Sequence, residues 1–334
     1  MDLQGLVDRT AAEIGFSGVV RVDRADRTEL SAAYGLADRR HSIAMSPDSQ
    51  VAMASGSKGL TALAVMSLVE DGALSLATTA RSLLGTDLPL IADDVTVEHL
   101  LAHRSGIGDY LDEDTDVPIS AYALRVPMQD LATVEQFLAV LDGFPTKFRA
   151  GERFSYCNGG FVVLALLAER ASGVPFHDLV RQRVCAPAGL VDTDFLRSDA
   201  LPGRAALGYV EMDGAWRTNV FHLPVLGSGD GGMYTTAADV HRFWTALFEG
   251  AIVGTPTVAR MIEPRSDVPE EGRRYGLGFW LHPTREVVQL DGYDAGVSFR
   301  SLHDPADGLT VTVVGTTSEG AWPVVRALEK ELIA

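Results

Sequence analysis

The chain has 334 residues, 46% of them hydrophobic and 22% charged, which is enough apolar material for a large globular core in about two domains. The formal net charge of −17 at pH 7 argues against a nucleic acid or an anionic membrane surface as a partner. The apolar runs are shorter than the roughly 20 residues that a membrane-spanning helix needs.

The first fifty residues predict one helix and two strands. The stretch "MDLQGLVDRTAAEIGF" has the periodicity of an amphipathic helix, and it lacks the basic and apolar regions of a signal peptide. "SGVVRVDR" and "TELSAAYGLAD" predict strands joined by a polar turn at residues 25–27. Cys157 and Cys185 are the only cysteines and are typical of free thiols in a reducing compartment. A cytoplasmic location is therefore expected, unless a leader has been removed.

The middle of the chain predicts helices. From about Ser55, the sequence is apolar on nearly every side up to Val69, as in a helix buried all round, and Gly72 is placed to follow its end. Further helical patterns occur in "TTARSLLGTDLPL", "VTVEHLLAHRSGIGDYL", residues 133–141, residues 160–172 and "VPFHDLVRQRVCAPAGL".

Strand patterns return near the C-terminus. They are "RRYGLGFWLHP", "EVVQLDG", "AGVSFRSLHD" and "GLTVTVVGTT", followed by a final helix in "AWPVVRALEKELIA". Strands at both ends with helices between them predict an α/β (α+β) fold. We expect one antiparallel sheet formed by both termini and flanked by helices, with an inserted, mostly helical domain. The expected domains are residues 1–65 with 225–334, and residues 66–224, with the active site in the cleft between them.

A lysine at the head of the buried helix is the first candidate for chemistry. Lys58 would stand in the first turn, where the helix dipole disfavours a cation, and only three lysines occur in the chain. Ser55 is three residues earlier and would lie on the same helix face. Burial and the helix N-terminus both lower a lysine pKa, so Lys58 could serve as a neutral base for the Ser55 hydroxyl. By themselves, these residues could equally be a helix cap and a lysine that reaches solvent.

Two further segments carry polar groups in suggestive positions. In "RFSYCNGG", Tyr156 and Asn158 are two apart in an extended segment and would face one site. Tyr156 could move protons if nearby cations lower its pKa, and Asn158 could bind a substrate carbonyl or a lysine; a helix cap and a core tyrosine are the structural alternatives. In "QLDGYDAGVSF", the glycines indicate either a hairpin turn or a close backbone approach that could supply an oxyanion donor.

Motifs of several other chemistries are missing from the sequence. It has no G-x-S-x-G elbow, no H-E-x-x-H, no Cys/His cluster with metal-ligand spacing, and neither of the two common phosphate-binding glycine motifs. The glycine-rich "GSGDGG" lacks the strand–helix context of a phosphate site, and the eight histidines are scattered. We therefore expect neither a metal nor a cofactor.

Taken together, "SGSK", "YCN" about a hundred residues later and a glycine-bearing strand turn near the C-terminus resemble the three active-site motifs of the serine β-lactamase and penicillin-binding-protein superfamily. The resemblance is nearest to class C β-lactamases, related DD-peptidases and family VIII carboxylesterases. "VTVEHLLAHRSGI", "AGERFSYCNGGFVVLALLAERASG" and "GGMYTTAADVHRFW" are also similar to segments of that family, so the likeness runs over about residues 18–317.

The resemblance implies acyl transfer through a covalent serine ester. It makes Ser55 the nucleophile, Lys58 the general base, Tyr156 a partner in proton transfer and Asn158 a residue that positions substrate and Lys58. The backbone N–H groups of Ser55 and Tyr293 would form the oxyanion hole.

The third motif departs from the family pattern. Leu290 stands where the family often has lysine or histidine, with Gly292 two residues later, and both belong to the predicted substrate-binding set. A leucine cannot bind a substrate carboxylate, which disfavours penicillins and peptides with a free C-terminus. The sequence therefore predicts a serine esterase acting on small acyl esters.

Three alternatives remain open at this stage: a β-lactamase or D-amino-acid-type peptidase, an acyltransferase, and a non-catalytic binding module. The expected partner is a small ester or amide, with no nucleic acid and no membrane span, and the oligomeric state is open. Residues 109–130 lie where a loop at the cleft edge could set selectivity.

Overall fold

The computed structural model describes residues 2–113, 115 and 117–333. Its centre is an eight-stranded antiparallel sheet in the order β10-β11-β12-β13-β14-β15-β1-β2, so strands from both ends of the chain are neighbours, as the sequence predicts. The strands are β1 (Gly18–Arg24), β2 (Arg27–Tyr34), β10 (Ser266–Val268), β11 (Arg273–Tyr275), β12 (Trp280–Leu281), β13 (Val288–Asp294), β14 (Val297–Asp304) and β15 (Leu309–Gly315).

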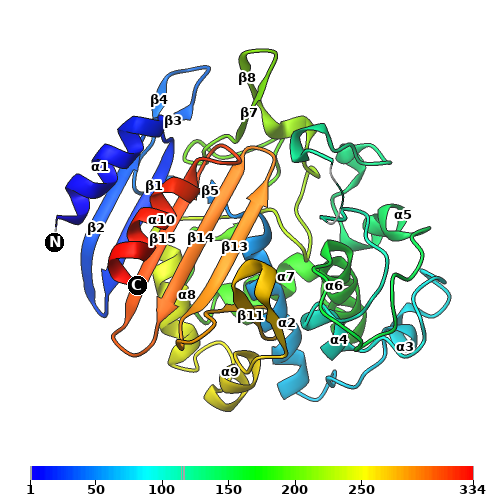
Figure 1. Ribbon diagram of the computed structural model, residues 1–334. Helices are drawn as coiled ribbons and strands as arrows, with labels where there is room; N and C mark the ends of the chain where they lie inside the picture. Colours follow the sequence, from blue (N-terminus) through cyan, green and yellow to red (C-terminus); the bar gives the residue numbers. More distant parts are fainter. Residues whose placement is uncertain (1, 114, 116, 334) are drawn as a thin grey trace.

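Helices cover both faces of this sheet. The terminal helices α1 (Leu3–Ile14) and α10 (Ala321–Leu332) lie together on one face, and α8 (Ala237–Phe248) lies on the other (Figure 1). The valines of β1 and β15 alternate between the two sides: Val20 and Val22 pack with α1 and α10, whereas Val19 belongs to the larger core on the α8 side. The predicted mixed α/β architecture is confirmed.

The larger core is organised by two helices. All residues of α2 (Lys58–Glu70) from Lys58 to Leu68 are buried, as are those of α6 (Asn158–Ser172) from Asn158 to Ala168, and the two helices pack against each other. The other helices are α3 (Ala80–Leu84), α4 (Val97–Leu101), α5 (Leu138–Leu141), α7 (Phe176–Val180) and α9 (Thr255–Met261). Both α3 and α4 are shorter than predicted, because Gly85 and His103 adopt positive φ angles that end them.

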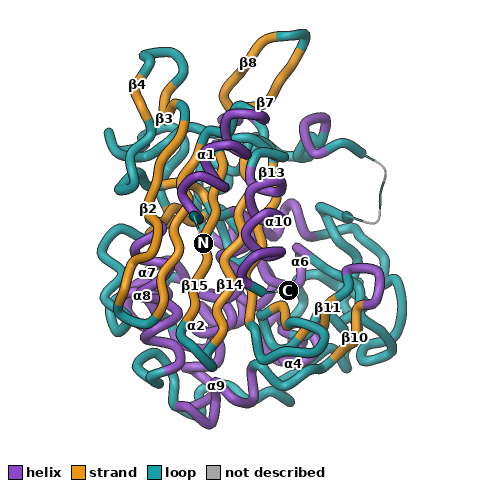
Figure 2. The backbone as a smooth tube through the Cα atoms, turned by 60° about the vertical axis from the view of Figure 1, so that its left-hand side comes forward, coloured by secondary structure: helices purple, strands orange, loops and turns teal. Residues whose placement is uncertain are grey.

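Residues 191–224, at the end of the predicted helical domain, differ from the mostly helical prediction. They contain short strands and a single 3₁₀ turn: β6 (Asp194–Phe195), β7 (Tyr209–Met212), β8 (Ala215–Thr218) and η6 (Asn219–Phe221). The strand β9 (Met233–Thr235) follows in the predicted sheet domain. β9 is the central strand of a small three-stranded sheet and pairs with β6 on one side and with β5 (Val51–Ala52) on the other, and this sheet leads the chain into α2. The hairpin β7–β8 projects from the same end of the molecule as β3 (Leu36–Asp38) and β4 (Ile43–Ala44) (Figure 2). Within the described ranges, no single helix is long and apolar enough to cross a membrane.

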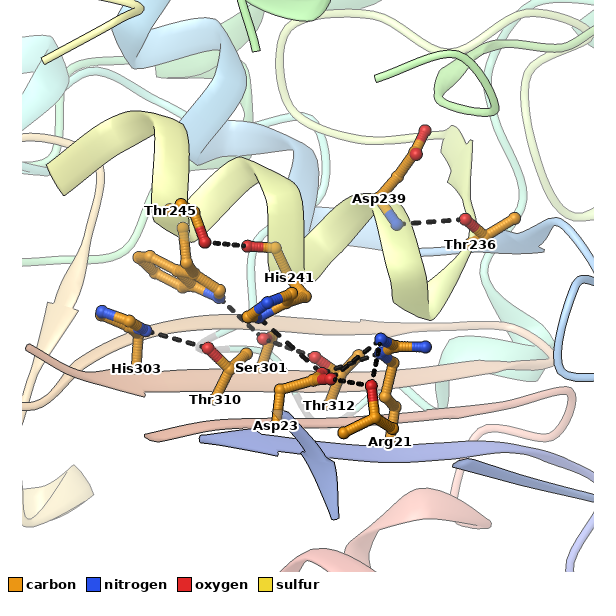
Figure 3. Close-up of polar contacts among 12 residues, drawn as sticks. Arg21, Asp23, Thr236, Asp239, His241, Thr245, Ser301, His303, Thr310 and Thr312 are labelled. Carbon is orange, nitrogen blue, oxygen red and sulfur yellow. Dashed lines mark hydrogen bonds and ion pairs between the residues drawn. The ribbon is translucent and has the colours of Figure 1, made fainter. Parts of the chain in front are cut away.

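A buried polar layer joins α8 to the sheet. The Trp244 indole donates to Ser301 (2.8 Å), and the His303 imidazole lies against Thr310 (2.9 Å) while stacking on Trp244 (Figure 3). His241 of α8 faces Asp23 of β1 at 3.8 Å. Burial lowers the pKa of His303 to about 4 and also lowers the pKa of His241, so both imidazoles are neutral in the folded protein near pH 7.

Because of this buried layer, we expect the free energy of unfolding to decrease at acidic pH. A histidine whose folded pKa is depressed contributes stability that is present above the ordinary pKa of about 6.5 and lost as pH falls toward the folded pKa, because the unfolded chain binds the proton first. We expect the urea midpoint of unfolding to fall between pH 7 and pH 5. His303→Phe keeps the stacking and removes one titrating group, so its midpoint should fall less over that range. An equal fall in both proteins would show that His303 is not responsible.

Candidate active site

Ser55 and Lys58 stand at the junction of two helices. Ser55 lies in the 3₁₀ turn η1 (Ala54–Ser57), and Lys58 is the first residue of α2. In a 3₁₀ turn, residues three apart are nearly eclipsed, and the Lys58 Nζ lies 2.8 Å from the Ser55 Oγ. The neighbouring Ser57 points elsewhere and donates to the carbonyl of Ala54 (2.8 Å). The turn thus brings together the two residues that the sequence pairs.

The Lys58 amine is buried, with a residue exposure of 2%, and it has three polar neighbours. Apart from Ser55, these are the Asn158 Oδ1 at 2.8 Å and the backbone carbonyl of Asp230 at 2.6 Å. Carbonyl oxygens only accept hydrogen bonds, so a neutral amine donates its two hydrogens to them and turns its lone pair toward the Ser55 hydroxyl. Burial lowers the pKa of Lys58, although the surrounding carboxyls, Asp230 first, oppose that shift.

Tyr156 closes another side of this site. Its ring centre lies 4.9 Å from the Lys58 Nζ, and its hydroxyl interacts with the Ser55 side chain. Burial and the charge of Glu113 raise the pKa of Tyr156 well above its ordinary value. Cations do not lower the pKa of Tyr156, which was the condition under which the sequence suggested proton transfer, because burial and nearby carboxyls outweigh the single amine. The phenol stays protonated and can act as a proton donor.

Asn158 is held by the start of α6. The buried Asp109 carboxylate accepts the backbone N–H groups of Asn158 (2.6 Å) and Gly159 (2.8 Å), which satisfies two otherwise free donors at the helix N-terminus. The Asn158 amide nitrogen then donates to the Leu111 carbonyl (2.9 Å) and to Glu113 (3.0 Å). This orientation turns the amide oxygen toward Lys58.

Strand β13 passes Ser55 with the part of its edge that lies beyond Gln289, where its pairing with β12 ends. The two-residue turn between Asp294 and Val297 makes these two residues a hydrogen-bonded pair, so the next pair, Tyr293 and Ser298, is not hydrogen-bonded. The Tyr293 N–H therefore points away from β14, toward η1. Gly292 makes the approach possible, because a Cβ there would stand 2.0 Å from the Met53 carbonyl oxygen. This is the close backbone approach that the sequence left as one of two alternatives.

Leu290 does not line the site, in contrast to the sequence-based prediction. Its side chain is 2% exposed and packs in the core, where a Cβ on Gly59 would stand 2.5 Å from it. Side chains alternate along a strand, so Leu290 faces α2, whereas Asp291 faces α10 and pairs with Arg273 and Arg300. A cation at position 290 would be buried in this core.

The sequence analysis missed the role of "GSGDGG". This stretch supplies the Asp230 carbonyl to Lys58 and runs against both core helices: a Cβ on Gly229 would stand 2.1 Å from the Phe161 carbonyl oxygen. The run of glycines was a visible signal, but only as evidence of close packing. The Asp230 carboxyl is itself hydrogen-bonded to Tyr110.

Two cavities meet at Ser55. The first has a volume of about 340 Å³ and is largely apolar; the loop within residues 109–130 forms one wall of it, with residues 114 and 116 lying outside the described residues. The second, of about 430 Å³, is more polar and is lined by Tyr156, Arg153 and Trp280, among others. Tyr293 borders both. Among the described residues, no group of three or more His, Cys, Asp or Glu side chains could hold a metal ion.

This geometry can be compared with known proteins. The sequence profile of the family described as Beta-lactamase matches residues 3–334. The crystal structure of a penicillin-binding protein from Bacillus halodurans is 33% identical, with a TM-score of 0.92, and the match covers 98% of this chain and all of that one. Esterase EstB of Burkholderia gladioli is 30% identical over 98% of this chain and 87% of its own length. The putative penicillin-binding protein PbpX of Bacillus subtilis is 26% identical over 81% of this chain, and the matched region spans 63% of the length of PbpX.

The approach of β13 to η1 gives a direct prediction. Gly292→Ala should force the strand away from Ser55, because the added methyl group meets backbone rather than a movable side chain. We expect the rate of Ser55 labelling by a fluorophosphonate to fall by about 10²-fold, the cost typical of one lost oxyanion donor. Gly203→Ala is the control, since a Cβ there has open space around it. Equal labelling of both variants would refute the proximity of β13 to the reacting atoms.

Proposed function

We propose that this chain, which belongs to the Beta-lactamase family, is a serine hydrolase that acts through an acyl ester on Ser55, with small carboxylic esters as its substrates. The observation that carries the proposal is the environment of Lys58. An amine that donates its hydrogens to Asn158 and to the Asp230 carbonyl keeps its lone pair available to accept the Ser55 proton. The Lys58 Nζ lies 2.8 Å from the Ser55 Oγ.

Acylation follows from this arrangement. Lys58 takes the Ser55 proton while the Ser55 oxygen attacks the ester carbonyl carbon. The carbonyl oxygen becomes an oxyanion, and the N–H groups of Ser55 and Tyr293 are placed to stabilise it. When the C–O bond to the alcohol breaks, the departing alkoxide takes the Tyr156 proton, which Lys58 replaces. The net change is transfer of the serine proton to the alcohol and of the acyl group to Ser55.

Hydrolysis of the acyl ester reuses the same groups. Water attacks the acyl carbon where the alcohol has left, and its proton passes to Lys58 through Tyr156. The tetrahedral intermediate then expels Ser55, which regains a proton. A second proton-accepting residue is not required, because the amine returns to its neutral form in each half-reaction.

The two cavities receive different halves of the substrate. Tyr156 lines the second cavity and must reach the leaving oxygen, so the alcohol extends into that space and the acyl group into the first, apolar cavity. Asp291 engages Arg273 and Arg300 beside the second cavity, and Leu290 supplies no cation. Arg153 also lines this cavity, but so do Glu113, Glu270 and Glu271, so an uncharged alcohol suits this side better than a β-lactam carboxylate.

The first test combines labelling with substrate preference. A fluorophosphonate should add once to the wild-type protein and not to Ser55→Ala, as measured by intact-protein mass spectrometry. The wild-type protein should hydrolyse p-nitrophenyl butyrate faster than nitrocefin, and Lys58→Ala should lose about 10²-fold or more in kcat/KM for the ester. For the wild type, kcat/KM should rise with pH as Lys58 loses its proton, with an inflection below the ordinary lysine pKa of about 10.4. Absence of the adduct on folded protein would exclude Ser55 as an activated nucleophile.

A second candidate function is hydrolysis of amides whose acyl part carries an amine. The first cavity is lined by Asp112, Glu113, Asp230 and Asp294, and none of its described lining residues is Lys or Arg. Burial and the nearby carboxyls raise the pKa of Asp294 to about 7, so an ammonium group bound there would relieve carboxylate repulsion.

Removing the charge of the substrate or of Asp294 tests this candidate. Alanine p-nitroanilide and its N-acetyl derivative differ in the ammonium group, and the ratio of their kcat/KM values should favour the free amine. Asp294→Asn should lower that ratio by about tenfold, equal to roughly 1.4 kcal/mol. Asp213→Asn, in the turn of β7–β8, is the control. A ratio that favours the acetylated compound would exclude amine recognition without affecting the ester proposal.

A further inference from the structure

His103 is a buried titratable residue that the reaction scheme does not use. It follows α4 in the segment "VEHLLAHRSG", is 1% exposed and has a φ of 53°. Residues other than glycine seldom adopt this left-handed conformation, although histidine is one of the side chains that tolerate it. A histidine buried this completely beside the reacting groups calls for a physical reason.

The imidazole has a defined tautomer. Its Nδ1 accepts the backbone N–H of Cys157 at 3.1 Å, so the proton lies on Nε2. That Nε2 has no hydrogen-bond partner among the described residues. Burial, and secondarily the charge of Lys58, lower the pKa of His103 well below its ordinary value. The ring is therefore neutral, and the orientation of one backbone amide depends on it.

The contacts of His103 converge on the segment that carries Tyr156 and Asn158. The His103 carbonyl accepts the Ser155 N–H at 2.9 Å, one residue before Tyr156. The imidazole ring lies 4.3 Å from the Tyr156 ring, centre to centre, and 4.9 Å from that of Phe161. The Cys157 N–H that it binds belongs to the peptide bond that joins Tyr156 to Cys157. His103 thus holds the backbone on both sides of Tyr156 and one face of its ring.

We propose that His103 is a positioning residue that aims the Tyr156 hydroxyl at the leaving oxygen by accepting the Cys157 N–H, while its ring packs at a tilt against the phenol ring. This inference rests on the proposed role of Tyr156 as the donor to the leaving group. A small displacement of such a donor costs much of its effect, because proton transfer requires hydrogen-bond distance in the transition state.

Leaving-group dependence separates positioning from a loss of folded protein. Ethyl butyrate and p-nitrophenyl butyrate form the same acyl enzyme, but ethoxide needs a proton to depart whereas p-nitrophenolate hardly does. The measured quantity is the ratio of kcat/KM for the ethyl ester to that for the p-nitrophenyl ester. A smaller folded fraction lowers both values equally and leaves the ratio unchanged. Tyr156→Phe is the reference and should lower the ratio by about 10²-fold.

Two amide substitutions form a matched pair. In His103→Asn, the side-chain oxygen takes the place of Nδ1, and asparagine accepts the positive φ; its ratio should stay within about threefold of the wild type. In His103→Gln, the oxygen lies one carbon further out and cannot replace Nδ1, so the ratio should fall by about tenfold or more, toward that of Tyr156→Phe. Equal ratios for the two variants, or a wild-type ratio in His103→Gln, would overturn the proposal.

A measurement on the wild-type protein covers the case in which His103→Gln does not fold. The ¹⁵N chemical shifts of His103 should report a neutral ring protonated on Nε2 at pH 7, and a charged or Nδ1-protonated ring would overturn the proposal. If Tyr156→Phe itself leaves the ratio unchanged, the proposed role of Tyr156 fails. In that case the failure lies with the proposed function and is distinguished from a failure of His103 alone.

Discussion

The burial of a single amine is the constraint on which the rest of the site depends. Lys58 sits almost fully out of water at the positive end of a helix, which is unfavourable for a charge. Its surroundings compensate with hydrogen-bond acceptors, two of them carbonyl oxygens, and with carboxyls further out. These opposing influences leave an amine that can exist without its proton, next to a serine hydroxyl.

The fold supplies these groups from three separate parts of the chain. Ser55 and Lys58 come from the junction of η1 and α2, Asn158 from the first residue of α6, and the Asp230 carbonyl from a glycine-rich loop. The packing of α2 against α6 brings the first two together, and the glycines let the loop approach. The edge of β13 that passes Ser55 completes the arrangement because Gly292 carries no side chain toward η1.

The two cavities at Ser55 differ in polarity, and this difference gives the site its direction. One side combines apolar walls with carboxyls, and the more polar side presents Tyr156 among arginines, carboxyls and tryptophans. In the proposed mechanism, a phenol that holds its proton lies on the side of the leaving group and can donate to it. His103 holds the backbone next to that phenol as a neutral ring, and its Nε2 has no hydrogen-bond partner in the part of the chain that the structure describes.

The sequence by itself determined the sheet built from both ends, the helix buried on all sides and the pairing of Ser55 with Lys58. These features follow from local periodicity and from spacing along one helix, which a short window of residues carries. The tertiary structure alone decided which way Leu290 faces, that the pKa of Tyr156 is raised, and that His103 and the Asp230 carbonyl adjoin the site. Those properties depend on contacts between residues far apart in the chain. Burial and the charges of side chains that are distant in sequence determine a pKa. The packing of a strand against other elements determines which of its two faces is buried.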